Sequence, residues 1–167
     1  MNKVHFIGIG GTGISAIALL LLEKGWQVSG TDKSASRYFD AVTAKGAYTL
    51  LGHSSELALA ADVIVRSSAV HDDDPEVVAA RKMGIPVLKR NEFLPELTAG
   101  YQTIAVAGSH GKTTCTAMLV MMLRGLGVDP TFILGAQIRP LATNAHAGTS
   151  DLFVIEADEY DNMFLGL

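Results

Sequence analysis

Two glycine-rich segments limit what this chain can fold into, because each joins an apolar run to a helix-forming run. The first, GIGGTG, spans Gly8–Gly13, and the second, AGSHGKTT, spans Ala107–Thr114. Glycines between a strand and a helix permit a tight turn and let a ligand approach the backbone closely. The repeated strand–turn–helix pattern predicts an α/β fold with two successive units, each built on a parallel sheet.

Further apolar runs predict the other strands and helices. In the first unit, strands are expected over 3–9, 26–32, 47–51, 62–68 and 85–88, with helices over 12–24, 34–45 and 75–84. In the second unit, strands are expected over 103–108, 131–134 and 151–156, with a helix over 112–124. The alternation predicts a Rossmann-like parallel sheet followed by the start of a P-loop α/β ATP-binding domain.

A more polar segment, Lys89–Gln102, separates the two units and contains Pro95 and Gly100. We place the domain boundary near Ala99, which gives domains at 1–98 and 99–167. Three strands and one helix cannot cover both faces of a parallel sheet. We therefore expect the second domain to be truncated, and we expect the fragment to be inactive on its own.

Composition excludes several classes of protein. With 17 acidic and 13 basic residues the formal net charge is −4, which gives no reason to expect nucleic acid as a partner. The single cysteine excludes an internal disulfide and suits a reducing compartment. The most apolar stretch, Ile14–Leu22, is too short to span a bilayer. We expect a cytoplasmic protein that does not act at a membrane.

The first glycine-rich segment matches a known phosphate-binding pattern. Gly8, Gly10 and Gly13 satisfy G-x-G-x-x-G, and Asp32 ends the next expected strand. Such a turn places a diphosphate on the N-terminus of the following helix, while the third glycine allows close packing of that helix. From these residues alone an NAD-dependent oxidoreductase is the default interpretation, and a tight turn without any ligand is the alternative.

The second segment is a shortened P-loop. Gly111, Lys112 and Thr113 end the pattern G-x-x-x-x-G-K-[ST], but Val106 occupies the position of its first glycine. Lys112 is expected to reach the β- and γ-phosphates of ATP, and the Thr113 hydroxyl to bind Mg²⁺. The full ATP-binding set is predicted as Gly108, Ser109, His110, Gly111, Lys112, Thr113 and Thr114.

Acidic residues supply the remaining candidates for a metal site. Glu156 ends an apolar strand, where its carboxylate would face the P-loop, and we predict that it binds the metal. Asp158, Glu159 and Asp161 crowd the next turn, where part of the cluster is a solvated acidic turn. The three aspartates at 72–74 are better explained by helix capping, because Asp74 precedes Pro75. The histidines have no metal-ligand spacing.

The complete set of motifs resembles the Mur ligases of bacterial cell-wall synthesis. The resemblance covers essentially the whole chain and depends on HFIGIGGTGISAIA, VSGTD, SSAV, DDPEVVAA, IPVLKR, AVAGSHGKTTCTAM, GVDPTFILGA and EADEYD. It implies that the first domain binds the uridine diphosphate part of a sugar substrate. The implied substrate-binding residues are Gly10, Gly11, Thr12 and Gly13 at the diphosphate, with Asp32, Ser67 and Ser68 near the uridine or sugar. The implied catalytic residues are Lys112 and Glu156, with Mg²⁺ on Thr113 and Glu156.

The resemblance also implies a reaction. Within the family the chain is most similar to the members that use ATP to join L-alanine to the carboxylate of UDP-N-acetylmuramate through an acyl phosphate. Tyr160 departs from those members, and EADEYD also resembles the recycling ligases that attach a whole peptide. A non-catalytic nucleotide-binding module and the oxidoreductase remain open. The family's third domain and the base for the amine are expected outside this sequence.

Overall fold

The chain forms two compact units, residues 1–90 and 91–167. The computed structural model describes residues 2–139 and 141–157. The division between the units falls at the start of helix α5 (Arg90–Thr98), whereas the boundary expected from the sequence lies at the end of this helix.

The first unit is a five-stranded sheet in which every strand pairs in parallel with its neighbours. The order is β3-β2-β1-β4-β5, which is the Rossmann-type order and confirms the predicted fold class. The strands are β1 (Lys3–Ile7), β2 (Gln27–Asp32), β3 (Tyr48–Leu51), β4 (Val63–Arg66) and β5 (Val87–Lys89). Because all five run the same way, their carboxyl ends meet at one edge of the sheet.

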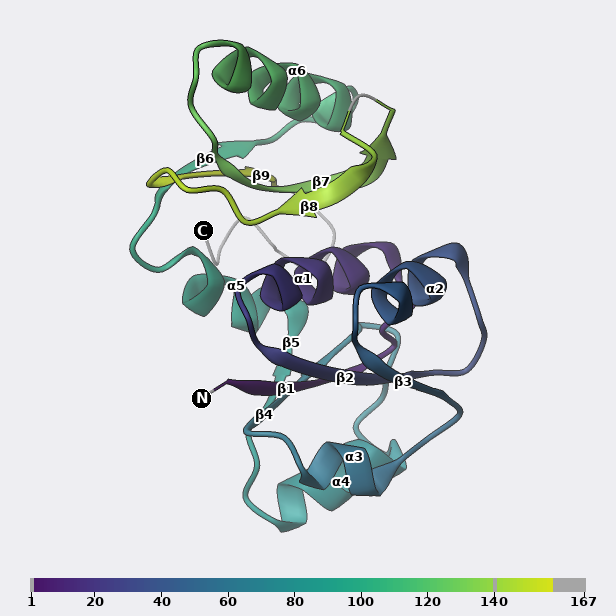
Figure 1. The fold of residues 1–167 in the computed structure, drawn as a ribbon. Helices are drawn as coiled ribbons and strands as arrows, with labels where there is room; N and C mark the ends of the chain where they lie inside the picture. The colour runs from purple at the N-terminus through teal and green to yellow at the C-terminus, as the bar shows by residue number, and fades with distance from the viewer. Residues whose placement is uncertain (1, 140, 158–167) are drawn as a thin grey trace. The chain divides into compact units, whose positions relative to one another are not determined.

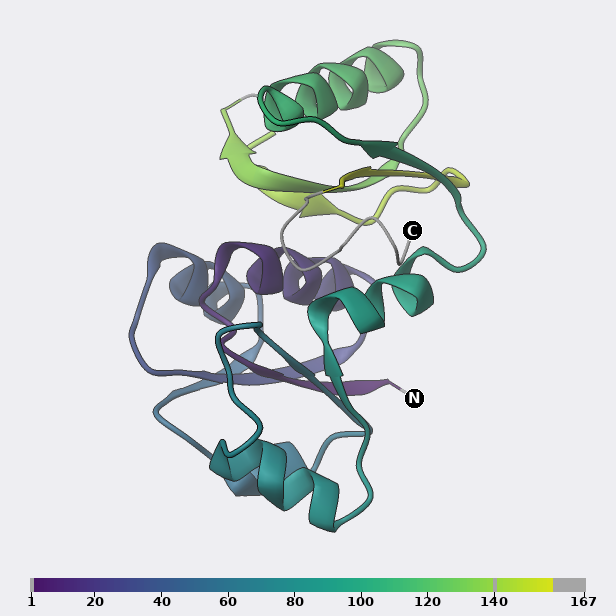
Figure 2. The ribbon, with the colours of Figure 1, turned by 180° about the vertical axis from the view of Figure 1, so that it is seen from behind.

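Helices cover both faces of this sheet, as Figures 1 and 2 show: α1 and α2 lie on one face, α3 and α4 on the other. Their bounds are α1 (Thr12–Glu23), α2 (Arg37–Ala44), α3 (Ser55–Leu59) and α4 (Pro75–Lys82). Helix α1 buries most of its residues, as its apolar sequence requires. On the other face Ile7 and Ile64 pack with Ala58 of α3 and Val77 of α4. Burial of these side chains is the main force that holds the layers together.

Side-chain caps begin α2 and α4: of Ser34 and Ser36, which the sequence left open for α2, Ser36 is the cap, and Asp74 caps α4 as predicted. The Ser36 hydroxyl accepts a hydrogen bond from the Phe39 N–H at the start of α2. Asp74 accepts one from the Glu76 N–H at the start of α4, where Pro75 occupies the first helical position. Gly84 follows the helix with φ 72°, the left-handed conformation that commonly ends a helix.

The second unit contains a four-stranded sheet of order β6-β9-β7-β8. Its strands are β6 (Gln102–Val106), β7 (Thr131–Ile138), β8 (Thr143–His146) and β9 (Leu152–Glu156). Helix α6 (Lys112–Gly125) covers one face, where Val120 packs with Phe132, Leu134 and Val154. The succession of β6, glycine-rich loop and α6 confirms the predicted P-loop arrangement of strand, loop and helix.

Three elements differ from the sequence-based expectation. Strand β8 pairs antiparallel with β7, so the second sheet is mixed, and its short polar sequence TNAH gives no strand signal. Helix α3 is only five residues long and begins at the cap Ser54. Helix α5 forms within the more polar segment in which we placed the domain boundary, because Phe93, Leu94 and Leu97 are buried at helical spacing.

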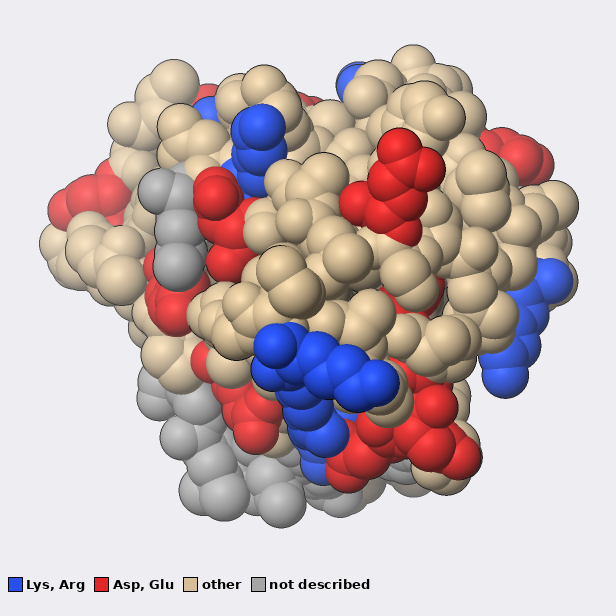
Figure 3. Space-filling model, turned by 90° about the horizontal axis from the view of Figure 1, so that it is seen from below, with Lys and Arg blue, Asp and Glu red and all other residues tan. Residues whose placement is uncertain are grey.

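Charged side chains of both signs are mixed on the face of the molecule shown in Figure 3. On the face shown in Figure 3, Lys and Arg side chains lie directly beside Asp and Glu side chains, so neither sign of charge dominates. Among residues 2–139 and 141–157, no helix is both long enough and apolar enough to cross a membrane.

Candidate nucleotide-binding sites

The turn after β1 is closed by its own backbone. Gly8 has φ 84°, and its N–H donates to the Thr31 carbonyl at 2.8 Å, while the Gly11 N–H donates to the Gly8 carbonyl at 3.1 Å. Helix α1 then begins with Gly11 as N-cap, without a side-chain cap and without an acidic residue in its first turn. The backbone N–H groups in the first turn of α1, which no side chain caps, are therefore the groups that can meet an anion.

Asp32 and Ser36 hold the middle of this turn. The Gly10 N–H donates to Asp32 Oδ2 at 2.8 Å, and the Ser36 hydroxyl donates to the Gly10 carbonyl at 2.9 Å. A Cβ on Gly10 would lie 3.0 Å from both side chains, so only glycine fits without displacement. Asp32, predicted to lie near the uridine or sugar, thus also fixes the conformation of the glycine turn.

A pocket of about 540 Å³ opens at the carboxyl end of the first sheet, the edge at which parallel α/β sheets bind their ligands. Gly8, which belongs to the glycine pattern, lines it. Of the predicted substrate residues in the described chain, Gly10, Gly11, Asp32 and Ser67 line it, whereas Thr12, Gly13 and Ser68 do not. A Cβ on Gly13 would strike the guanidinium of Arg90, not the strand we expected.

A buried carboxylate beside this pocket was not recognised from the sequence. Glu76 accepts hydrogen bonds from the Thr31 hydroxyl at 2.7 Å and from the Ser54 N–H, and His5 Nε2 lies 3.7 Å from its Oε1. Burial raises the pKa of Glu76, but the interactions with His5, Ser54 and Thr31 outweigh it and hold the pKa below its ordinary value. Glu76 is therefore an anion that connects β1, β2 and the β3–α3 turn.

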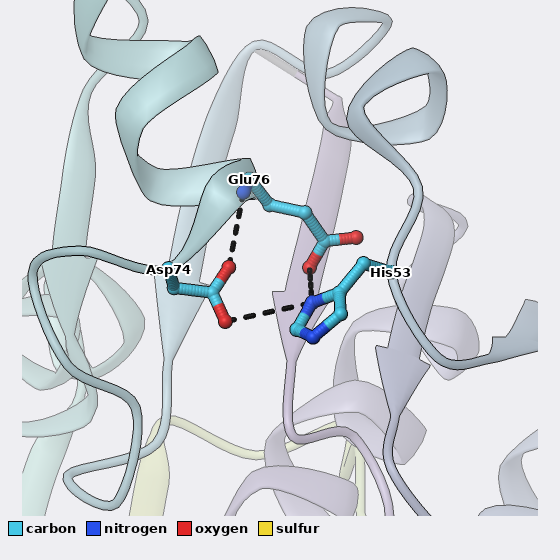
Figure 4. Close-up of side chains that lie close together, drawn as sticks. All are labelled: His53, Asp74 and Glu76. Carbon is cyan, nitrogen blue, oxygen red and sulfur yellow. Dashed lines mark hydrogen bonds and ion pairs between the residues drawn. The ribbon is translucent and has the colours of Figure 1, made fainter.

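His53 lies between two carboxylates at the edge of the same pocket (Figure 4). Its Nδ1 is 3.5 Å from Asp74 Oδ2 and 3.9 Å from Glu76 Oε2. These three side chains are of metal-ligand type, but both carboxylates already accept hydrogen bonds, and they sit at the positive end of α4. The geometry fits contacts of the imidazole with the two carboxylates better than a cation site.

The second glycine-rich loop leads from β6 into α6. Gly108 has φ 146°, and Gly111, the N-cap of α6, has φ 76°, so both take conformations that favour glycine. The Lys112 ammonium group donates to the Gly108 carbonyl at 2.8 Å and thereby folds back over the loop. The first turn of α6 carries no acidic side chain. This places the Lys112 ammonium group beside the backbone of the loop.

Two predicted metal ligands meet beside this loop. The Thr113 hydroxyl donates to Glu156 Oε2 at 3.0 Å, and the Gly135 N–H donates to Glu156 Oε1 at 2.6 Å. Parallel pairing of β6 with β9 places Glu156 opposite Val106, immediately before the loop. A Cβ on Gly135 would lie 2.8 Å from Glu156 Oε2, so this glycine leaves room for the carboxylate.

Three other predicted residues of the loop are exposed and make none of these contacts. Ser109, His110 and Thr114 are exposed at the surface of the second unit, and the structure gives them no described side-chain partner. Asp158, Glu159, Tyr160 and Asp161 lie outside the described residues. A cation bound by Thr113 and Glu156 would have hard oxygen ligands, which fits Mg²⁺.

Two successive α/β units, each with a glycine-rich turn that leads from a strand into a helix N-terminus, define the class of this protein, and such turns are suited to phosphate groups. Residues 3–102 match the family described as Mur ligase family, catalytic domain. The chain therefore belongs to the Mur ligase family.

Curated relatives agree with this assignment. The chain is 50% identical to a UDP-N-acetylmuramate–L-alanine ligase from Frankia casuarinae, a match that covers 99% of the chain and 34% of that protein. It is 47% identical to the ligase of the same name from Aquifex aeolicus, covering 100% of the chain and 37% of the relative. The chain thus spans about a third of the length of these curated relatives.

Solved structures are similar along most of the chain. A UDP-N-acetylmuramate–alanine ligase from Thermotoga maritima matches with a TM-score of 0.83 and 30% identity, covering 92% of this chain and 37% of that one. A UDP-N-acetylmuramate:L-alanyl-gamma-D-glutamyl-meso-diaminopimelate ligase from Neisseria meningitides matches with a TM-score of 0.85 and 31% identity, covering 97% and 54%.

Proposed function

We propose that this chain is the sugar-nucleotide- and ATP-binding part of a ligase that joins L-alanine to the carboxylate of UDP-N-acetylmuramate. The observation that carries the proposal is the contact between the Thr113 hydroxyl and the Glu156 carboxylate beside Lys112. This is the arrangement that a Mg²⁺–ATP site requires, and a dehydrogenase would have no use for it. The names of the curated relatives support the same substrates.

In this proposal the first unit holds the sugar nucleotide. The uncapped N-terminus of α1 takes the diphosphate, since Gly10 and Gly11 carry no side chain that would cover it. Asp32 and Ser67, which line the pocket, lie toward the uridine or sugar. The pocket of about 540 Å³ lies within the size range of small-molecule and cofactor sites.

The second unit holds ATP. Backbone N–H groups from Gly108 to Thr114 surround the phosphates, and Lys112 exchanges its hydrogen bond with the Gly108 carbonyl for contacts with the β- and γ-phosphates. Thr113 and Glu156 would hold Mg²⁺, which when bound neutralises charge on the phosphates. Glu156 is oriented for this role by the Gly135 N–H.

The chemical task is to make an amide from a carboxylate, which is a poor electrophile. The muramoyl carboxylate attacks the γ-phosphorus of ATP, the bond to the β,γ-bridging oxygen breaks, and an acyl phosphate and ADP form. The amine of L-alanine then displaces phosphate. Lys112 offsets negative charge on the transferring phosphoryl group, and the loop positions it for attack. We propose that the reaction takes place in the cytoplasm, where ATP is available.

Two other functions remain as alternatives. A ligase that adds a peptide would use the same two sites, and the similarity to the Neisseria meningitides enzyme supports this alternative. An NAD-dependent oxidoreductase would use the turn at Gly8–Gly13 but would leave Lys112 and Glu156 without a role. A non-catalytic nucleotide-binding module would bind both ligands without turnover.

Calorimetric titration of the 167-residue chain with UDP-N-acetylmuramate, NADH and ATP tests the proposal directly. We expect binding of the sugar nucleotide, weak binding of ATP and no binding of NADH. Tight NADH binding would restore the oxidoreductase interpretation, and absence of sugar-nucleotide binding would overturn ours. Phosphate release from ATP with L-alanine or with a peptide, measured in a ligase that contains this chain, separates the two ligases.

A further inference from the structure

One wall of the pocket is a single loop between β4 and α4. This β4–α4 loop, residues Ser67–Asp74, contributes most of its residues to the pocket lining: Ser67, Ala69, Val70, His71, Asp73 and Asp74. A loop of this length has many accessible conformations, and fixing its backbone in one of them costs conformational entropy. The pocket therefore depends on whatever holds the loop in its present conformation.

Two arginines hold the loop through Asp72, a loop residue that does not line the pocket. Arg66, at the end of β4, donates to the Val70 carbonyl and to Asp72 Oδ1, the latter at 2.8 Å. Arg81, in the last turn of α4, donates to the same Asp72 oxygen at 2.8 Å. The loop is thus connected to the strand before it and to the far end of the helix after it.

The charges in this cluster fit a role in fixing geometry. The hydrogen bond from Arg81 and the nearby charge of Arg66 hold the pKa of Asp72 below its ordinary value, so the carboxylate stays ionised at neutral pH. Arg66 is only 6% exposed, and its Nε has no hydrogen-bond partner among the described residues. A buried guanidinium gives little net stability compared with an apolar side chain of similar size, but it does specify one arrangement of its partners.

We infer that Arg66 and Arg81 are positioning residues that act through Asp72 to keep the β4–α4 loop in the conformation that binds the sugar nucleotide. The inference depends on the proposed function, since it names the ligand of this pocket. None of the three side chains lines the pocket, so each acts on the ligand only through the loop. Preforming the loop raises affinity because binding no longer has to order it.

Asp72→Asn and Arg81→Gln test the inference in the 167-residue chain. Both side chains are exposed by more than half, so these substitutions should leave the unfolding midpoint in urea close to that of the original chain. Arg124→Gln is the matched control, because it removes a comparable arginine–aspartate pair, with Asp129, within the second unit. Two measurements are made on each variant: affinity for UDP-N-acetylmuramate by calorimetry, and backbone amide hydrogen exchange.

We expect both loop variants to bind UDP-N-acetylmuramate on the order of tenfold more weakly, the result if the binding conformation is populated a tenth of the time. Amide exchange should accelerate within Ser67–Asp74 and stay unchanged in β1 and β2. The Arg124→Gln control should match the original chain in both measurements. Unchanged affinity in both loop variants, or a general loss of exchange protection, would overturn the inference.

The exchange measurement keeps this inference distinct from the proposed function. If the original chain fails to bind UDP-N-acetylmuramate, the proposed function is wrong, whatever the variants do. Amide hydrogen exchange of the variants then tests only the conformation of the loop. Faster exchange confined to Ser67–Asp74 supports positioning by Arg66 and Arg81, and unchanged exchange rejects it.

Discussion

The guanidinium of Arg90 lies directly against Gly13, in the space that a side chain at this position would occupy. The Cβ of an alanine there would be 3.0 Å from Cζ of Arg90 and even closer to Nη1. Gly13 is the second residue of α1, so the third glycine of the first glycine-rich pattern leaves room for Arg90, the first residue of α5.

Gly13→Ala should therefore destabilise the first unit by about 1 kcal/mol, the low end of the usual cost of overpacking, because the atoms displaced are the far end of a flexible side chain. In an Arg90→Ala background the same substitution should instead stabilise α1 by up to about 1 kcal/mol, because alanine is the better helix former. A double-mutant cycle from urea unfolding measures the coupling. Additive effects of the two substitutions would show that the contact has no energetic role.

Lys112→Ala should reduce ATP-dependent ligation by about two to three orders of magnitude in a ligase that contains this chain, because the phosphoryl group loses its neighbouring cation. Affinity for UDP-N-acetylmuramate should stay near that of the original protein. Initial rates of ADP release and calorimetry give the two quantities. Lys82→Ala, at an exposed lysine in the last turn of α4, serves as the control. Equal loss of both quantities in the Lys112 variant would contradict the assignment of two separate sites.

Glu156→Gln should raise the Mg²⁺ concentration needed for ATP use on the order of tenfold, since an amide is a poor substitute for an anionic ligand of a hard cation. The fold should tolerate it, because the amide oxygen can still accept from the Gly135 N–H. Asp151→Asn, at the other end of β9, is the control. An unchanged Mg²⁺ requirement would show that Glu156 is not a metal ligand and that another carboxylate binds the ion.

Glu76→Gln should lower the free energy of unfolding at neutral pH by about 2 kcal/mol or more, because an amide brings donor hydrogens to an oxygen site that accepts from Thr31 and Ser54. The pKa of Glu76 is depressed in the folded state, so its stabilisation is complete above the ordinary carboxyl pKa. The stabilisation is lost as the pH falls through the lower, folded value.

Urea unfolding of the original chain and the Glu76→Gln variant between neutral and acidic pH measures this effect. The difference between the two proteins should shrink toward the acidic end. A difference that is constant with pH would mean that the charge of Glu76 contributes nothing to stability.

The sequence predicts the layers of both units well, because their signals are local. The apolar runs, the caps Ser36 and Asp74, and the glycines that end helices each act within a few residues. Strand β8 and helices α3 and α5 escape prediction for the opposite reason. Helix α5 forms in spite of Pro95 because Phe93 and Leu97 are buried in the folded chain. The segment TNAH becomes strand β8 because it pairs with β7.

The candidate sites were predicted only in part. The P-loop pattern names Lys112 and Thr113, and the end of an apolar strand indicates Glu156, because these signals lie in short segments. Which ligand each site holds stays a prediction. Glu76 and His53 were missed, since their importance arises from neighbours distant in the sequence. An acidic residue in a first helical turn ordinarily means no more than helix capping.

The hydrogen bonds of Glu76 also limit the order in which the first unit can fold. Its partners Thr31 and Ser54 precede it by 45 and 22 residues, and His5 lies near the very start of the chain. During synthesis the residues of the glycine turn are made long before those of α4. The loop that forms one wall of the pocket, and the Glu76 carboxylate beside it, are made only when α4 is. Contacts of such long range form late in folding and slow it. A nascent chain that ends at β3 would therefore carry the glycine-rich sequence of the first site but lack the pocket.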